Sequence, residues 1–207
     1  MTVALQVRAA GRRSALLLRP WSLGDMVALL AEMAYEYPRR GLHSHPETGR
    51  PEWGCWTGPS DEQQAWEWLA GQDRGWHDGD WLTFAVFEQH ESVPSYCLAG
   101  HVGLKSCTRG DRLAQSESAE VSYWIAAAAR GRGVATAALT AVTAWAFENF
   151  ATTGLVQIKL VHDLDNHASC RVADKSGYAF QKVSPANPPL WFTAGHIHTR
   201  SAGAFTG

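Results

Sequence analysis

The stretch that decides the fold is Ser118–Ala135, SAEVSYWIAAAARGRGVA. Its first eight residues alternate between apolar and polar, which predicts a strand. Gly131 and Gly133 follow, where glycines let the backbone turn sharply. The next segment, 134–150, is apolar almost all round and predicts a buried helix. A near-continuous apolar run at 155–161 predicts a strand buried on both faces. This is one strand–helix–strand unit, whose two strands should be parallel and connected with a right-handed crossover.

The segments on either side of this unit predict the rest of one mixed sheet. Strands are expected at 16–19, 81–87, 96–104, 178–183 and 190–197, and helices at 25–35, from Ser60 to about 71–75, and at 166–176. The early strands should be antiparallel. The fold class is therefore α/β, with an α+β mixed sheet flanked by helices. Residues 1–200 are expected to form a single domain, and residues 201–207 a flexible tail.

Composition narrows the functional classes. The chain has 207 residues, 22.6 kDa and a net charge of −2, which fits one domain and gives no overall attraction to nucleic acid. No apolar run is long enough to span a membrane, and the N-terminus lacks a signal-peptide pattern. The four cysteines form no CxxC pair, which favours reduced thiols and a cytoplasmic location.

The segment Arg130–Ala135 is a candidate anion site because it joins a strand to a helix. Its glycines can turn backbone N–H groups towards an anion, and the helix that follows adds unpaired N–H groups and the positive end of its dipole. Arg130 and Arg132 add charge, so the segment suits a pyrophosphate. The alternative is a glycine-containing turn with two solvated arginines. The spacing fits neither the Rossmann fingerprint nor the Walker A loop.

Two motifs resemble the GNAT superfamily of N-acetyltransferases. The strand at 120–125 followed by Arg130-x-x-Gly-x-Ala135 looks like the family's acetyl-CoA motif. The segment Asn166-x-x-Ser-x-x-Val-x-x-Lys-x-Gly-Tyr178 resembles its next motif, and Leu18–Trp21 resembles its first strand. The resemblance covers about residues 16–183 and is nearest to the RimJ/RimL-type ribosomal-protein N-terminal acetyltransferases. It implies a mostly antiparallel sheet in which the parallel central strands splay apart.

The resemblance implies that acetyl-CoA is the cosubstrate and that its pantetheine arm enters the gap between those strands. Asn166 would be a polar partner of that arm. The expected cofactor contacts are the strand backbone at Trp124, Ile125 and Ala126, and the loop amides of Arg130, Gly131, Arg132, Gly133, Val134 and Ala135.

The chemistry needs a group that removes a proton from the amine and a group that assists the leaving thiolate. Glu120 is the candidate base, because desolvation on a half-buried strand raises a carboxyl pKa towards neutrality. The alternative is an ordinary solvent-facing glutamate, and Glu117 is a weaker competitor. Many relatives carry a tyrosine seven residues after the asparagine, where this chain has Ala173. Ser169 is the remaining hydroxyl on that helix face, unless it only caps the helix.

Other hydroxyls and aromatic residues complete the candidate site. Tyr123 and Tyr178 are alternatives to Ser169 for assisting the thiolate. The long breaker-rich connection Arg39–Pro59 is expected to lie on the acceptor side, where Trp53 and Trp56 are candidate substrate contacts together with Tyr123.

No metal is expected, because His43, His45 and Cys55 are too few for a zinc site. His77, His101 and His162 are candidate proton relays, although lone histidines are more often structural. Cys170 is interpreted as a packing residue, and His196 and His198 have no partner that the sequence identifies.

The prediction is an acetyl-CoA-dependent N-acetyltransferase. It would move the acetyl group by direct attack of a primary amine in a ternary complex, the amine belonging to a protein N-terminus or a small molecule. No nucleic-acid or membrane partner is expected, and exposed late strands could pair in a homodimer. The alternative is a non-catalytic acyl-CoA-binding sensor or interaction module with the same fold, which the absent tyrosine favours. A third hypothesis is a nucleotide-binding protein that does not use CoA.

Overall fold

One eight-stranded sheet organises the protein. The computed structural model describes residues 3–8, 15–36, 58–89, 95–107, 111–186 and 194–203. The strand order is β1-β2-β3-β4-β5-β6-β8-β7, and every neighbouring pair is antiparallel except β5 and β6. The strands are β1 (Leu5–Arg8), β2 (Ala15–Pro20), β3 (Trp81–Gln89), β4 (Tyr96–Ser106), β5 (Ser118–Ile125), β6 (Gln157–Asp163), β7 (Ala179–Ser184) and β8 (Gly195–Ser201). The mixed α/β fold class and the single parallel pair are confirmed.

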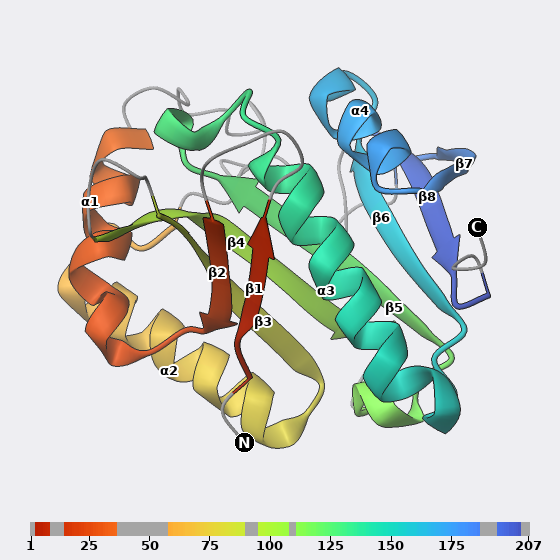
Figure 1. Cartoon of the computed structure of the whole chain (residues 1–207), viewed down its shortest axis with the longest axis horizontal. Coiled ribbons are helices and arrows are strands. Elements are labelled where there is room, and N and C mark those ends of the chain that lie inside the picture. The colour runs from red at the N-terminus through yellow and green to blue at the C-terminus, as the bar shows by residue number, and fades with distance from the viewer. Residues whose placement is uncertain are drawn as a thin grey trace.

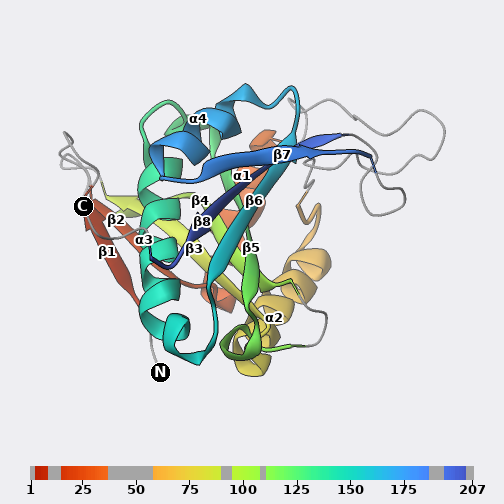
Figure 2. The same cartoon turned by 90° about the vertical axis from the view of Figure 1, so that its right-hand side faces the viewer.

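Helices cover both faces of the sheet (Figure 1). The helices are α1 (Met26–Glu36), α2 (Glu62–Asp78), α3 (Val134–Phe150) and α4 (His167–Lys175). Seen from the side, α3 lies on one face and α1 and α2 lie on the other (Figure 2). The predicted apolar character of α3 has a plain cause, since Ala138, Leu139, Val142 and Ala146 are fully buried in the core. No helix among the described residues is long and apolar enough to cross a membrane.

The parallel pair splays, as expected. β5 and β6 are paired only from Ser118↔Gln157 to Val121↔Leu160, although both strands continue beyond that point. The other edge of β5 stays paired with β4 as far as Gly100↔Ile125. The end of β5 therefore presents a backbone edge that does not pair with β6, and α4 begins beside it.

The prediction that the second helix ends near 71–75 is wrong. Asp61 caps α2 by accepting a hydrogen bond from the Gln64 amide at 2.8 Å, and the helix continues to Asp78, where Gly79 takes the left-handed conformation. Gly75 lies inside the helix. A larger residue would not fit at this position, because its Cβ would collide with the carbonyl oxygen of Trp81 and lie 3.1 Å from the Trp81 Cβ. This glycine marks a close approach between α2 and β3 rather than a helix end.

Sequence reasoning misplaced the two ends of the sheet. β1 was not predicted, because only Leu5 and Val7 give it an apolar face on a four-residue edge strand. The last strand was expected at 190–197, but β8 runs from Gly195 to Ser201 and so enters the segment expected to be a tail. The Ala202 amide also donates to the Val156 carbonyl at 3.0 Å. Residues 204–207 lie outside the described part of the chain.

Candidate active site

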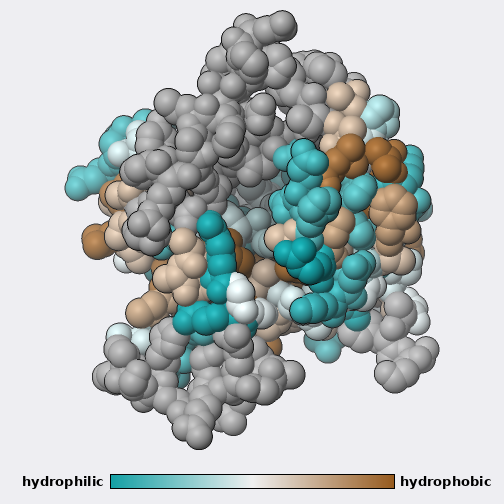
Figure 3. All heavy atoms as spheres, turned by 90° about the horizontal axis from the view of Figure 1, so that it is seen from above, coloured by the Kyte–Doolittle hydropathy of each residue, from teal (hydrophilic) through white to brown (hydrophobic). Residues whose placement is uncertain are grey.

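Two pockets meet where β5 and β6 separate. The first, of about 560 Å³, lies between the end of β5, the loop at 129–133 and the facing side of α4, and is called the loop pocket. The second, of about 290 Å³, is bounded by tryptophans from α2, β3 and β5, and is called the tryptophan pocket. Four residues line both pockets: Tyr123, Trp124, Asn166 and Ser169. The surface at this end of the molecule is hollowed, with hydrophilic side chains around the hollow (Figure 3).

The backbone conformation of the loop requires its two glycines. Gly131 and Gly133 have φ angles of 71° and 76°, in the left-handed region that favours glycine. A Cβ on either would meet no atom within 4 Å, so neither glycine is explained by packing. Both line the loop pocket, and the space beside them is open to a ligand. The predicted sharp turn between strand and helix is therefore present.

The loop pocket is positively charged. Its described lining residues include Arg130, Arg171 and Lys175 but no carboxylate. The first turn of α3, Val134–Thr136, adds amide groups that have no partner within the helix and the positive end of the helix dipole. Sequence reasoning did not assign Arg171 or Lys175 a role. Their spacing of four residues on one helix was the available signal.

Two groups of the predicted site, the Arg132 side chain and the Ala126 amide, are engaged elsewhere. The Arg132 guanidinium forms an ion pair with the nearly fully buried carboxylate of Glu88 on β3 at 2.5 Å, and Arg132 does not line the loop pocket. The Ala126 amide donates to the Ala99 carbonyl at 2.9 Å, and Ala126 is buried. The predicted residues Trp124, Ile125, Val134 and Ala135 do line the pocket. The Arg132 side chain thus anchors the loop to the sheet.

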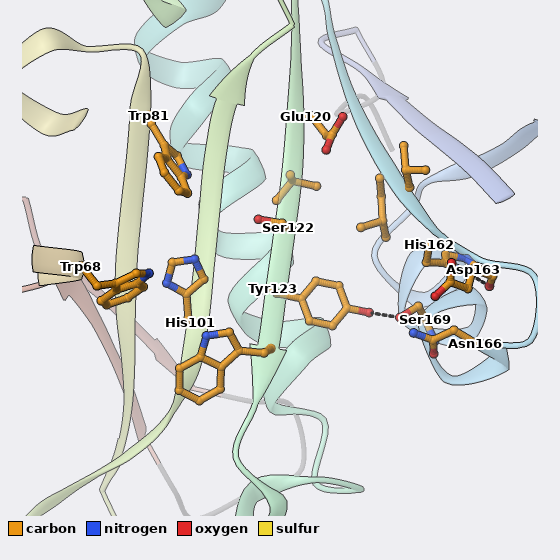
Figure 4. A pocket seen from close by; sticks show the side chains of 14 residues that line it. Trp68, Trp81, His101, Glu120, Ser122, Tyr123, His162, Asp163, Asn166 and Ser169 are labelled. Atoms are coloured by element: carbon orange, nitrogen blue, oxygen red, sulfur yellow. Dashed lines mark hydrogen bonds between the residues drawn. The ribbon is translucent and has the colours of Figure 1, made fainter. Parts of the chain in front are cut away.

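A pair of hydroxyl groups lies at the junction of the pockets. The Tyr123 hydroxyl donates to Ser169 Oγ at 3.0 Å across the gap between β5 and α4 (Figure 4). Asn166 caps α4, its Oδ1 accepting from the Ser169 amide at 3.1 Å. Ala173 lies one turn further along α4 and is fully buried. The helix therefore brings Ser169 to the junction, and a tyrosine from β5 reaches it.

The two candidate tyrosines differ in access. Burial raises the pKa of Tyr123 while its hydrogen bond to Ser169 opposes the shift, so the phenol stays protonated at neutral pH. Tyr178 is 1% exposed, and its hydroxyl shares a 2.6 Å hydrogen bond with Thr143 Oγ1. Tyr178 lines neither pocket, so only Tyr123 is placed to act there.

Glu120 lines the tryptophan pocket between two lysines. In the sheet it lies directly opposite Lys105 on β4 and Lys159 on β6. Desolvation nevertheless raises the pKa of Glu120, because the lysines offset the cost of burial only in part. Glu117 is exposed and lines neither pocket. The structure thus favours Glu120 over Glu117 as a base.

The comparison with protein families identifies the fold. The family model described as acetyltransferase (GNAT) domain matches residues 15–179. The chain belongs to the GNAT acetyltransferase family. A comparison with curated proteins finds no match.

Solved GNAT structures share the whole architecture. Mycobacterium smegmatis RimJ in complex with CoA-disulfide has a TM-score of 0.74 at 18% identity, covering 99% of this chain and 89% of that one. A putative ribosomal-protein-serine acetyltransferase from Vibrio cholerae has a TM-score of 0.66 at 21% identity, covering 97% and 99%. The microcin C7 self-immunity acetyltransferase MccE, in complex with acetyl-CoA and AMP, has a TM-score of 0.67 at 14% identity, covering 90% and 92%. The TM-scores show a common fold, and at these low identities the likeness shows the fold alone. The expected resemblance to RimJ/RimL proteins is confirmed at that level.

The wall of the tryptophan pocket in this GNAT protein is aromatic. Trp68, Trp81 and His101 lie on one side of the pocket, and Asp163, Asn166 and Ser169 lie on the other (Figure 4). Sequence reasoning did not select Trp68 or Trp81, because a tryptophan within a helix or strand is usually core. The predicted contacts Trp53 and Trp56 lie outside the described residues.

His101 packs within this wall. Trp21 Nε1 donates to His101 Nδ1 at 3.0 Å, and the His101 ring stacks on Trp124 with an interplanar angle of 3°. Burial lowers the pKa of His101 to about 3, so the imidazole is neutral at physiological pH. A ring that is buried, neutral and already accepting a hydrogen bond at Nδ1 is suited to holding the tryptophans in place.

Proposed function

We propose that this GNAT protein is an acetyl-CoA-dependent N-acetyltransferase that moves the acetyl group to a primary amine by direct attack in a ternary complex. The observation that carries this proposal is the meeting of the two pockets at Tyr123, Trp124, Asn166 and Ser169. A cationic pocket and an aromatic pocket joined at two hydroxyl groups suit a reaction between a phosphorylated thioester and an amine.

The loop pocket fits the phosphates and the pantetheine arm of acetyl-CoA. Arg130, Arg171 and Lys175 supply positive charge, and the open space beside the loop glycines lets the backbone approach a pyrophosphate closely. The edge of β5 that does not pair with β6 leaves backbone groups for the amides of the arm. The thioester would then reach the junction, where Ser169 lies.

Glu120 removes a proton from the incoming ammonium group, directly or through water. Its raised pKa suits a base that works near neutral pH. The amine nitrogen then bonds to the acetyl carbon and the carbon–sulfur bond breaks. The nitrogen passes its second proton to water, and Glu120 returns the first proton to solvent before the next turnover. Ser169 hydrogen-bonds the departing thiolate. Because Tyr123 already donates to Ser169, the serine proton can move to sulfur while the tyrosine proton replaces it. The phenol is restored from solvent.

The acceptor is a primary amine on a protein N-terminus or a small molecule. The rings of Trp68, Trp81 and Trp124 line this pocket, and an indole face turned towards a cationic amine would attract it, because the face is the negative part of the ring quadrupole. A peptide acceptor is also supported by the name of the Vibrio cholerae neighbour, a putative ribosomal-protein-serine acetyltransferase.

The test measures thiol release from acetyl-CoA in the presence of a panel of N-terminal peptides and small amines, with binding followed by calorimetry. Turnover that depends on both acetyl-CoA and an amine supports the proposal. Micromolar acetyl-CoA binding without turnover on any amine would favour the non-catalytic sensor, which the buried Ala173 supports as the second candidate. Absence of binding by folded protein would overturn both.

A further inference from the structure

Three histidines and a cysteine converge beside the tryptophan pocket, which one of them, His162, also lines. They are His162 at the end of β6, Cys170 on α4, and His196 and His198 on β8, and one potential ligand atom from each lies within 4.8 Å of all the others. Cys170 Sγ lies 3.2 Å from His196 Nδ1 and 3.5 Å from His162 Nε2. Three imidazoles and a thiol form a donor set that binds zinc-like cations.

The topology explains why these residues meet. His162 and His196 are direct partners across the β6–β8 pairing, and His198 lies two residues further along the same face of β8. Cys170 is in the first turns of α4, which follows β6 directly. Because Cys170 and His196 lie 26 residues apart, the sequence does not show that the histidines of β8 meet His162 and Cys170. The expectation of no metal rests on His43, His45 and Cys55, which lie outside the described residues.

His198 is the observation that points to a ligand. It is 2% exposed, and neither of its ring nitrogens has a hydrogen-bond partner among the described residues. Burying an imidazole with both nitrogens unsatisfied is costly, so such groups call for a partner. A metal ion held by the cluster would satisfy one of these nitrogens.

His162 is already oriented as a ligand. Its Nδ1 lies 2.8 Å from the carbonyl oxygen of Asp163, which fixes the proton on Nδ1 and leaves the lone pair of Nε2 facing Cys170. Histidines that bind zinc usually donate their other ring N–H to a carbonyl or carboxylate in this way. The hydrogen bond at Nδ1 thus holds the His162 ring so that Nε2 is available to bind a metal ion.

We propose that His162, Cys170, His196 and His198 form a structural site for one zinc-like divalent cation. Tetrahedral coordination with Zn–S of about 2.3 Å and Zn–N of about 2.0–2.1 Å places ligand atoms roughly 3.3–3.6 Å apart. The Cys170 contacts are already close to these values, and the remaining ligands need side-chain shifts on the order of 1 Å. Four protein ligands leave no open position for water or substrate, which is typical of structural rather than catalytic zinc.

The bound ion would tie α4 to both β6 and β8. Cys170 follows Ser169 directly, so the ion would also fix the part of α4 that carries Ser169 and its cap, Asn166. The Phe180 ring lies against His196 and His198, with centroid separations of 5.2 Å and 5.7 Å, and gives the cluster an apolar cover. The site therefore joins the C-terminal strands to the helix beside the pockets.

The test uses the full chain without an affinity tag, freed of metal by a chelator and kept reduced. Zn²⁺ binding is measured by calorimetry and by elemental analysis after dialysis, and Co²⁺ is used as a spectroscopic probe. We expect one Zn²⁺ per chain with a Kd below about 10 μM, and Co²⁺ absorption with a thiolate charge-transfer band and intense visible bands of a tetrahedral site. A hundredfold excess of Zn²⁺ over its Kd should raise Tm by roughly 5–10 °C.

Matched variants separate this site from adventitious binding. Cys170→Ser and His198→Gln should each weaken Zn²⁺ binding at least tenfold and lower the Tm rise by about half or more at the same Zn²⁺ concentration. Cys170→Ser should also remove the charge-transfer band. Cys107→Ser, at an exposed free cysteine, and His77→Gln, on α2, should bind like the wild type. Far-UV circular dichroism verifies that each variant is folded. Absence of stoichiometric binding by the wild type, or equal binding by Cys170→Ser and Cys107→Ser, would overturn the proposal. All of these measurements omit acetyl-CoA, so they are independent of the acetyltransferase activity.

Discussion

The Tyr123 hydroxyl on β5 donates a 3.0 Å hydrogen bond to Ser169 Oγ on α4, and both residues line the two pockets that meet there. The bond spans the gap that opens where β5 and β6 stop pairing. It places a protonated phenol behind the serine. Tyr123 thus brings a phenol to Ser169 from another element, in a chain that has Ala173 where the family resemblance predicts a tyrosine.

Tyr123→Phe should lower kcat about 10²-fold, because it removes the donor behind Ser169 while keeping the ring. The KM for acetyl-CoA should change less than about threefold, since the phosphate contacts are untouched. Steady-state kinetics with saturating amine measures both values. Tyr96→Phe, at an exposed tyrosine on β4, is the matched control and should behave like the wild type.

Coupling between the two hydroxyls gives a sharper test of the same pair. If Tyr123 acts through Ser169, the double variant Tyr123→Phe/Ser169→Ala should be little slower than Ser169→Ala alone. Multiplicative losses in the double variant would show that the two hydroxyls act separately and would contradict the relay.

Glu120→Gln should lower kcat/KM about 10²–10³-fold and leave acetyl-CoA affinity unchanged, because the carboxylate lines only the acceptor side. A base must be ionised, and desolvation raises the pKa of Glu120. The wild-type kcat/KM should therefore fall as the pH is lowered through that raised pKa, and Glu120→Gln should lose this acidic limb. A pH–rate profile of both proteins measures this. Glu117→Gln, at an exposed position outside both pockets, should retain the limb.

The same substitution should make the protein more stable at neutral pH. A folded-state pKa raised above the unfolded value means that the fold binds the proton more tightly than the unfolded chain does. The contribution of Glu120 to the free energy of unfolding is fully present below its unfolded-state pKa. It is lost as the pH rises through the folded-state pKa. Glu120→Gln removes that loss, so its Tm should exceed the wild-type Tm at pH 7 and the gap should close towards pH 4. A gap that widens on acidification would contradict the assigned direction of the shift.

The strand–helix–strand unit could be predicted because its signals are local. Alternation in β5, the glycines of the loop and the apolar α3 each depend on neighbouring residues, and the parallel pairing follows from the crossover. The glycine at 75 could not be interpreted in this way. A glycine is required at position 75 because the backbone of Trp81, on β3, lies against it. That contact is not visible in the sequence, so the sequence alone predicts a helix end there.

In the candidate site, too, the features that depend on neighbouring residues could be predicted, and the contacts between distant segments could not. Glu120, Ser169 and the loop glycines could be selected because strand alternation, glycine spacing and the family motifs mark their positions along the chain. The Tyr123–Ser169 bond, the ion pair of Arg132 with Glu88, and the cluster around Cys170 all join segments more than 25 residues apart or on different elements. Such pairs depend on the strand register and on the orientation of the helices. Residue spacing fixes neither of these, so the pairs are seen only in the structure.

Gly133→Asp should weaken acetyl-CoA binding at least tenfold, which is about 1.4 kcal/mol. The aspartate would place a negative charge beside the expected pyrophosphate and would strain a backbone with a φ of 76°. Calorimetry measures the affinity. Gly154→Asp is a matched control, since Gly154 has a φ of 130° with no atom near its Cβ position and lies outside both pockets. Equal affinity of the two variants would argue against a phosphate site at the loop.

Trp81→Leu should raise the KM of a cationic amine about fivefold, which corresponds to the loss of roughly 1 kcal/mol of cation–π attraction. The affinity for acetyl-CoA should not change, because Trp81 lines only the tryptophan pocket. Kinetics with varied amine and calorimetry with acetyl-CoA measure the two effects. Trp66→Leu provides the control, since Trp66 is a tryptophan on α2 that is 50% exposed and outside both pockets.

Gly75→Ala and Gly71→Ala should shift stability in opposite directions, although both lie inside α2. At Gly75 the added methyl group meets the Trp81 backbone, which must move, and overpacking of this kind costs about 1–3 kcal/mol. At Gly71 the nearest atom is a flexible Arg74 nitrogen at 3.6 Å, so the better helix propensity of alanine should stabilise the protein by about 0.5–1 kcal/mol. Urea unfolding of the two variants and the wild type gives both values. Because β3 carries Trp81 into the tryptophan pocket, Gly75→Ala should also raise the amine KM, whereas Gly71→Ala should not. Stabilisation by both substitutions would show that α2 and β3 are further apart than the structure places them.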